Sequence, residues 1–368
     1  MKRMLAGLFF VLILLYNGSA LAEGAKASIL IEAQTGRVLY EQNAHEVLPM
    51  ASTTKVMTAL LALEKGNLSD PVTASENAFG VPGTSIYLSL GETLSLEEML
   101  YGLMLASGND AAVAIAEHIG GTVEEFCRMM TERAGEIGCE NTLFSTPHGL
   151  PSANHYTTAH DLALITREAM KNPIFREIVS TQRASIPWQD HDYDRVLTNK
   201  NKLLSSYPGA MGVKTGYTKA AGRCLVFAAK RDGMALIGVV LNCPDWFNEA
   251  AALLDKGFEN WQMVTLLSQG EAVRRIPVEN GVQETVALIA AQDVAAPVKM
   301  DSWPDIRIDL PASVPAGIEK GQEIGSISLV DGGEIIATVP LCAAESVEEA
   351  VFRHRLTRLL ESWPLSAR

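Results

Sequence analysis

The sequence lacks an excess of positive charge. Its 368 residues include 30 Lys and Arg against 43 Asp and Glu, which gives a formal net charge of −13. Proteins that bind nucleic acid usually carry a basic surface, so this balance argues against a nucleic-acid partner. With 48% hydrophobic residues the chain can bury a sizeable core, and its length is sufficient for two domains.

Cysteine is scarce and shows no spacing typical of disulfides or zinc ligands. We expect mostly buried free thiols from this odd number of residues, Cys127, Cys139, Cys224, Cys243 and Cys342. A bridge between Cys224 and Cys243 stays open if the predicted strands that carry them are neighbours. Three histidines, His148, His155 and His160, lie close in sequence, but their spacing is not that of metal ligands and no H-E-x-x-H occurs. The sequence predicts no metal and no cofactor.

Long apolar runs are also missing, except at the amino terminus. Lys2 and Arg3 precede an apolar stretch over 4–16, and a small-residue A-L-A sequence follows at 20–22. This order is typical of a signal peptide over 1–22, so we expect an exported, extracytoplasmic mature chain that begins at Glu23. An uncleaved anchor is the alternative, although the run is shorter than the ~18 residues of a spanning helix.

The order of predicted elements indicates a mixed α/β region. A strand, a turn at 34–36 and a second strand start at Ala27, and three more strands are predicted over 209–217, 223–233 and 234–243. Helices are predicted between them, from Ser52 to Gly66, from a capping box at Ser95, and over 110–121, 123–137 and 160–170, and a last helix over 247–262. We therefore expect one antiparallel sheet, assembled from both ends of residues 27–265 and flanked by helices.

Short strand patterns follow beyond Ser268, with a hairpin turn D-G-G at 331–333. They predict a small all-β domain over 268–343, after a catalytic domain over 23–267. The remaining residues, 344–368, are predicted to form an amphipathic helix. Its apolar face would contain Val347, Val351, Leu356, Leu359, Leu360 and Trp363.

An S-x-x-K sequence, Ser52 to Lys55, places an ammonium group at the start of a predicted apolar helix. Residues three apart share a helix face, so this ammonium can approach the serine hydroxyl. Serine is a weak nucleophile until a base takes its proton, and a desolvated lysine near another cation can be that base. The pKa of such a lysine must fall from ~10.4 towards ~7–8. One S-x-x-K is expected by chance in a chain of this length, so the motif needs partners.

Ser107 and Asn109 form an S-G-N sequence between two predicted helices. Such a junction can direct side chains into a cleft, where Ser107 would relay a proton and Asn109 would hold a substrate carbonyl or Lys55. Two other S-x-N sequences start at Ser75 and Ser152, and only the position between two helices favours Ser107. The alternative role for Ser107 is helix capping.

A K-T-G sequence, Lys214 to Gly216, lies in a predicted strand. Glycine within a strand often marks close approach of another backbone, and an edge strand can bind an extended peptide. Lys214 and Thr215 would then offer a cation and a hydroxyl to a substrate carboxylate. The alternative is an ordinary strand end with a solvated lysine.

Together these three motifs, in this order, resemble those of the penicillin-recognising serine transferases, which include penicillin-binding proteins and serine β-lactamases. Over roughly 27–254 the sequence is similar to the low-molecular-weight D-alanyl-D-alanine carboxypeptidases. The stretches that carry this similarity are PMASTTKVMTALLALE, ASGNDAAVAIAEHIGG, TPHGL, TNKNKLL and GVKTGYTKAAGRCLVFAAKRDG. The resemblance is looser over the β domain, which that family also has.

The resemblance implies a serine peptidase that acts on peptidoglycan stem peptides at the cell wall or the outer face of the membrane. Ser52 would attack the bond between two D-alanines with Lys55 as base, and the backbone N–H groups of Ser52 and Tyr217 would hold the oxyanion. Penicillins should acylate Ser52 and stall. One departure concerns an arginine that some members carry after the strand LIGVVL, where this chain reads NCPDWFNEAA.

Three other functions remain as alternatives. A class A β-lactamase would need a glutamate in an E-x-x-L-N setting, whereas this chain offers Glu168 and Asn172 in a different pattern. A D,D-endopeptidase on cross-links would use the same residues, and a non-enzymatic cell-wall binding protein would not need them. The carboxy-terminal helix resembles a membrane-surface anchor, and docking on the protein itself is the alternative.

Overall fold

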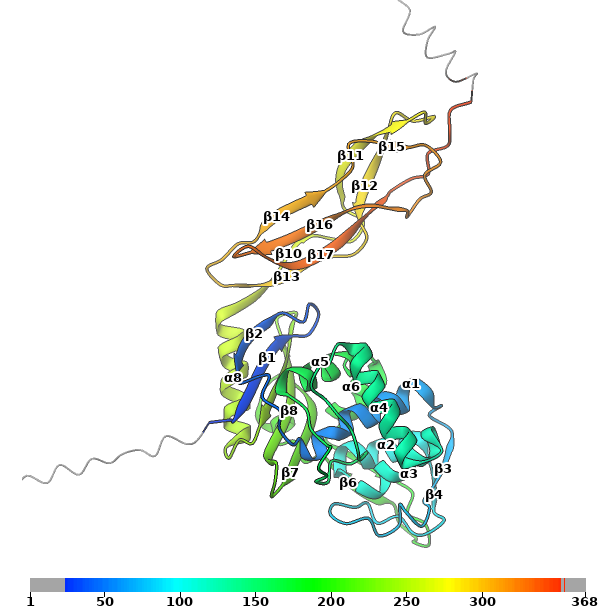
Figure 1. Ribbon diagram of the computed structural model, residues 1–368, viewed down its shortest axis with the longest axis vertical. Helices are drawn as coiled ribbons and strands as arrows, with labels where there is room; N and C mark the ends of the chain where they lie inside the picture. The colour runs from blue at the N-terminus through cyan, green and yellow to red at the C-terminus, as the bar shows by residue number, and fades with distance from the viewer. Residues whose placement is uncertain (1–23, 352–353, 355–368) are drawn as a thin grey trace, which may run out of the picture.

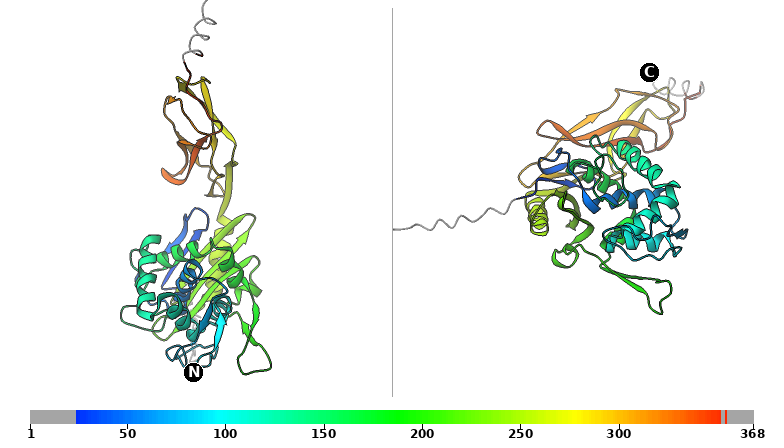
Figure 2. Two further views of the ribbon diagram at one scale, coloured as in Figure 1. Left: turned by 90° about the vertical axis from the view of Figure 1, so that its right-hand side faces the viewer. Right: turned by 60° about the horizontal axis from the view of Figure 1, so that its bottom comes forward.

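The computed structural model describes residues 24–351 and 354. Within this range the chain forms a mixed α/β domain and an elongated β domain, stacked end to end (Figures 1 and 2). The predicted signal peptide and most of the predicted carboxy-terminal helix lie outside the described residues. Of the helices that the structure describes, none has the length and apolar character needed to cross a membrane.

A five-stranded antiparallel sheet with the order β2-β1-β9-β8-β7 forms the centre of the α/β domain. Its strands are β1 (Ala27–Glu32), β2 (Val38–Gln42), β7 (Ala210–Thr218), β8 (Gly222–Arg231) and β9 (Met234–Leu241). The pairing of β1 with β9 joins the two ends of the domain, so the prediction of one sheet built from both ends is confirmed. This order leaves β7 at one edge of the sheet.

Helices cover both faces of the sheet (Figure 1). One face packs against α1 (Lys55–Lys65), α5 (Ala159–Ala169) and α6 (Pro173–Ser180). On the same side α2 (Leu96–Tyr101), α3 (Asn109–Gly120) and α4 (Val123–Ile137) pack against one another, and α3 and α4 pack on α1. The other face carries α8 (Trp246–Asn260), which packs on Leu225 and Phe227 of β8. Burial of apolar residues on both faces explains why β1 is buried along its whole length.

Short elements complete this domain. They are β3 (Pro71–Thr73), β4 (Thr93–Ser95), β5 (Arg183–Ile186), β6 (Arg195–Thr198) and α7 (Leu203–Ser206). The predicted capping box is confirmed, since Ser95 Oγ accepts from Glu98 N and the Glu98 carboxylate accepts from Ser95 N. Cys224 and Cys243 are free thiols, so the bridge between them does not form.

Two helix boundaries differ from the regular helices that the sequence predicts. A 3-10 turn, Ala51–Thr54, precedes α1, and a π turn, Gly102–Ala106, follows α2. The π turn ends at Ser107, whose φ of 67° is left-handed. A left-handed backbone at a residue other than glycine is often found at a functional site, and Ser52 lies in the first turn while Ser107 directly follows the second.

The β domain contains a two-stranded and a six-stranded sheet. Its strands are β10 (Trp261–Leu267), β11 (Ala272–Glu279), β12 (Thr285–Ala290), β13 (Val294–Lys299), β14 (Asp305–Asp309), β15 (Val314–Pro315), β16 (Glu323–Asp331) and β17 (Glu334–Ala343). The hairpin predicted at 331–333 joins β16 to β17. Residues 344–351 are extended rather than helical, because buried Val347 pairs with Ile318 in the core of this domain.

Candidate active site

Ser52 lies in the 3-10 turn before α1, directly against the edge strand β7. A Cβ atom at Gly216 of β7 would lie 2.9 Å from Ser52 N and 3.0 Å from Thr53 N. Both neighbours are backbone atoms, which cannot move aside cheaply. The close backbone approach predicted for K-T-G is therefore present, and Gly216 permits it because it has no side chain.

Lys55 extends from the first turn of α1 towards Ser52, as the three-residue spacing predicts. Its Nζ lies 3.1 Å from Ser52 Oγ and 2.8 Å from both Asn109 Oδ1 and the His148 carbonyl oxygen. Lys55 is fully buried. Each of these three oxygens can accept one proton of an ammonium, so the contacts fix the direction of the side chain.

The charge on Lys55 is strongly disfavoured. Burial lowers its pKa well below the ordinary value of 10.5, and repulsion from Lys214 and Lys200 lowers it further, while Asp110 acts in the opposite direction. A neutral amine keeps a lone pair that can accept the proton of Ser52. Lys55, although it lies in an apolar helix, thus has the lowered pKa that a general base needs.

Asn109 connects Lys55 to the loop at residues 82–84. Its Oδ1 accepts from Lys55, its Nδ2 donates to Pro82 O at 2.7 Å, and its backbone N donates to Thr84 O at 2.7 Å. Of the two roles that the sequence left open for Asn109, holding Lys55 is the contact present here. Ser107 and Ser52 line the same cleft.

The competing serine and histidine motifs have structural partners elsewhere. Ser75 Oγ and Asn77 Nδ2 bond the carboxylate of Glu117, so this S-x-N lies outside the contacts of Lys55. His155 contacts Thr54 Oγ1 at 2.7 Å, and burial followed by repulsion from Lys55 lowers its pKa to about 4. Among the described residues no group of His, Cys, Asp and Glu has the arrangement of a metal site.

Lys214 and Thr215 lie on β7 beside Ser52. Lys214 is 1% exposed, and its Nζ donates to the Thr215 carbonyl oxygen at 2.9 Å. Burial, followed by repulsion from Lys200, lowers the pKa of Lys214 to about 7. Tyr217, the next residue after the K-T-G, is exposed at the cleft.

These elements surround a cleft of about 510 Å³. It is lined by Ser52, Thr84, Ser107, Lys200, Lys202, Thr215, Gly216, Tyr217, Arg223, Trp246 and Phe247. Lys200 and Lys202 belong to the T-N-K-N-K-L-L sequence. The resemblance of this sequence to the family was the one indication that these two lysines lie near the site. Arg223 lies in the stretch around K-T-G that resembles the family, but no sequence motif assigned it a role, and Trp246 had no signal. The pairing of β7 with β8 and the packing of α8 bring these two residues to the cleft.

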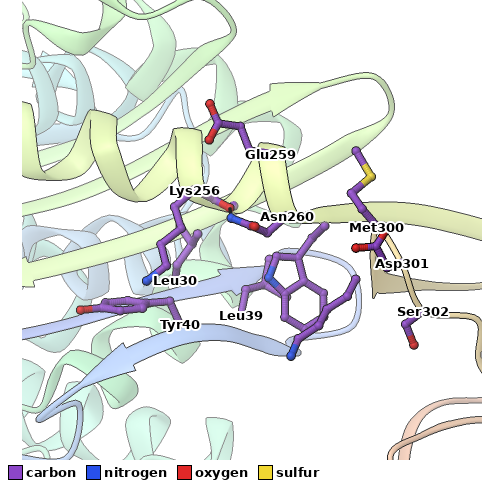
Figure 3. Close-up of a pocket in the computed structure, with 12 residues that line it drawn as sticks. Leu30, Leu39, Tyr40, Lys256, Glu259, Asn260, Met300, Asp301 and Ser302 are labelled. Carbon is purple, nitrogen blue, oxygen red and sulfur yellow. Dashed lines mark hydrogen bonds between the residues drawn. The ribbon is translucent and has the colours of Figure 1, made fainter.

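A larger cavity of about 590 Å³ lies at the junction of the two domains (Figure 3). It lies between β2 and α8, where Lys256 Nζ is 4.1 Å from the ring centre of Tyr40. None of the three motifs contributes to its lining. Residues of all three motifs line the smaller cleft at β7 instead.

Glu168, the residue considered for a β-lactamase deacylation role, is engaged elsewhere. Its carboxylate bonds Lys171 at 2.6 Å and Arg133 at 3.3 Å. The Lys171 bond comes first among the causes that lower its pKa. It is not among the described residues that line the cleft.

Comparison with known proteins agrees with this geometry. The D-alanyl-D-alanine carboxypeptidase family model matches residues 17–245, and the model of the penicillin-binding protein 5 C-terminal domain matches residues 261–349. The D-alanyl-D-alanine carboxypeptidase DacF of Bacillus subtilis is 37% identical, over 94% of this chain and 91% of the relative. DacC of Escherichia coli is 32% identical, over 90% and 86%.

Solved structures are similar as well. Penicillin-binding protein 5 from Haemophilus influenzae has a TM-score of 0.76 and 30% identity, over 89% of this chain and 98% of that one. The carboxypeptidase DacD from Francisella tularensis has a TM-score of 0.66 and 28% identity, over 88% and 94%. Sequence, fold and cleft agree, and the chain belongs to the D-alanyl-D-alanine carboxypeptidase family of serine peptidases.

Proposed function

We propose that Ser52 is the nucleophile of this carboxypeptidase and that Lys55 is its general base. The supporting observation is the 3.1 Å contact between Lys55 Nζ and Ser52 Oγ, made by a fully buried lysine beside a second buried lysine. The enzyme removes the terminal D-alanine of peptidoglycan stem peptides through an acyl-enzyme. Penicillins present a similar acyl group and inhibit it.

Acylation begins when neutral Lys55 takes the proton of Ser52 Oγ as this oxygen attacks the carbonyl carbon between the two D-alanines. The backbone N–H groups of Ser52 and Tyr217 hold the oxyanion, and each such donor typically contributes about 3 kcal/mol to the barrier reduction. Ser107 relays a proton to the leaving amine, while Asn109 keeps Lys55 in place. Water then hydrolyses the ester and restores Ser52.

The substrate backbone adds to the edge of the sheet at β7. In this arrangement Gly216 leaves room for the peptide and for the Ser52 turn, and Tyr217 borders the scissile bond. Thr215 offers its hydroxyl to the terminal carboxylate. Lys214, buried on the same strand, adds positive potential nearby when it is protonated.

Mass spectrometry tests this function directly. The protein is incubated with penicillin and, separately, with a diacyl-tripeptide that ends in D-Ala-D-Ala. We expect a stable penicilloyl adduct on the peptide that contains Ser52, and release of one D-alanine from the tripeptide. An adduct on another residue would contradict the assignment of the nucleophile, and fast turnover of penicillin would indicate a β-lactamase instead.

The pH dependence of kcat/KM should respond to the charge of Lys200. Acylation needs neutral Lys55, so kcat/KM rises with pH through the pKa of Lys55, which lies well below 10.5. Lys200 lowers that pKa by repulsion, so Lys200→Gln should raise it and move the acid limb to higher pH. Steady-state rates against pH measure the shift. The exposed Lys219→Gln is the matched control, and equal shifts in both variants would contradict the assignment.

We also propose that the mature enzyme acts outside the cytoplasm and touches the membrane through residues 351–368. Support comes from the signal-peptide pattern at 1–22 and from the arginines at 353, 355 and 358, which would attract anionic lipid. Sedimentation with vesicles of phosphatidylglycerol and phosphatidylcholine tests it, with a chain ending at Ala350 as the control. Equal sedimentation of both chains would refute the membrane contact.

A further inference from the structure

The cleft needs an exposed cation for the substrate carboxylate, and Lys214 does not provide one. Its side chain is 1% exposed, its Nζ is directed to the Thr215 carbonyl, and its pKa is lowered to about 7 by burial and then by Lys200. The segment after β9 reads N-C-P-D-W-F over 242–247 and contributes no cation. The charge that pairs with the carboxylate must therefore come from another element.

Arg223 of β8 lies beside the position where the carboxylate would bind. It is the cross-strand partner of Tyr217, and Leu225 is the partner of Thr215 in the same antiparallel ladder. Thr215 and Arg223 are thus diagonal neighbours on one face of the sheet. Diagonal neighbours lie about 7–8 Å apart, within reach of a long side chain. A carboxylate bonded to the Thr215 hydroxyl is therefore within reach of the Arg223 guanidinium.

The segment after β9 holds this guanidinium in place. Arg223 Nη1 donates to the Pro244 carbonyl oxygen at 2.6 Å, and its Cζ lies 6.0 Å from the ring centre of Trp246. Within the described part of the chain, no carboxylate forms an ion pair with Arg223. Arg223 lines the cleft, and a guanidinium has five N–H groups, so it can donate to a ligand there while it bonds Pro244.

We propose that Arg223 pairs with the terminal carboxylate of the D-Ala-D-Ala substrate and of penicillin. The inference rests on the proposed function, because it assigns a specificity residue to that same cleft. In this chain the cation comes from β8, and Pro244 and Trp246 orient it. Lys200 and Lys202 are competing cations, because both are exposed and line the same cleft. They belong to the loop between β6 and α7 rather than to the strand pair that carries Thr215, and Lys200 lowers the pKa of Lys55 and of Lys214 by repulsion, so we assign it to their electrostatics.

Two diacyl-tripeptides that differ only at the carboxy terminus test the inference. One ends in a free D-Ala-D-Ala carboxylate, and the other ends in the carboxamide. We expect the wild-type enzyme to prefer the carboxylate. Arg223→Gln should lower kcat/KM for the carboxylate about 10- to 100-fold, as expected for one lost charge-assisted hydrogen bond, and leave the amide unchanged. Arg223→Lys keeps a cation without the forked geometry and should retain part of the preference.

Lys219→Gln removes one exposed positive charge from the same hairpin and should keep the full preference. Thermal unfolding of each variant checks the fold. An equal fall on both peptides, or loss of the preference in Lys200→Gln but not in Arg223→Gln, would overturn the role of Arg223. If the wild-type enzyme releases D-alanine from the free acid and Arg223→Gln still prefers the carboxylate to the carboxamide, only the inference about Arg223 is overturned. A wild-type enzyme that cleaves neither peptide would overturn the proposed function as well.

Discussion

Replacement of Ser52 by alanine should abolish both D-alanine release and labelling by penicillin. The variant has no oxygen to form the acyl-enzyme, and loss of a serine nucleophile in other hydrolases costs about 10⁶-fold in kcat. Gel fluorescence with a labelled penicillin and chromatography of released D-alanine measure the two losses. Because Ser52 is partly accessible in a short turn, the variant should unfold at nearly the wild-type temperature.

Ser152→Ala is the matched control for this experiment. Ser152 starts another S-x-N sequence, and it is exposed in the structure, so its loss should change neither readout. Unchanged labelling of Ser52→Ala would exclude Ser52 as the nucleophile. Loss of labelling in Ser152→Ala would show that the motif was assigned to the wrong serine.

Replacement of Lys55 by alanine should lower the rate of penicillin acylation by about 10²- to 10⁴-fold, the usual contribution of a general base. Ser52 keeps its hydroxyl in this variant. It loses the amine that lies 3.1 Å from Oγ and that would take its proton. Stopped-flow labelling gives the acylation rate. Far-ultraviolet circular dichroism should match the wild type, because Lys55 lies at the start of α1 and alanine is a strong helix former.

Lys55→Arg separates the role of a base from that of a structural cation. Arginine keeps the positive charge and several hydrogen bonds but cannot be deprotonated, so we expect it to be as inactive as alanine. Lys65→Ala, at the exposed end of the same helix, should be fully active. Recovery of acylation in Lys55→Arg would remove proton transfer from the role of this residue.

Local sequence patterns determined much of the fold. The capping box at Ser95, the hairpin at 331–333 and the period of α4 each depend on residues that are close in sequence, and each is present as predicted. The segment 344–351 was predicted as helix from apolar spacing. There the long-range pairing of Val347 with Ile318 decides an extended conformation, which no local pattern records.

The site divides in the same way. The spacing of Ser52 and Lys55 is local, so the sequence alone placed the amine beside the hydroxyl, and the three motifs together indicated the family. Only the tertiary structure decided how far the pKa of Lys55 is lowered, because the burial of Lys55 and its approach to Lys214 depend on packing between α1 and β7. It also decided that Arg223 lines the cleft, since no sequence motif assigned this residue a role and the register of β7 against β8 places it opposite Tyr217.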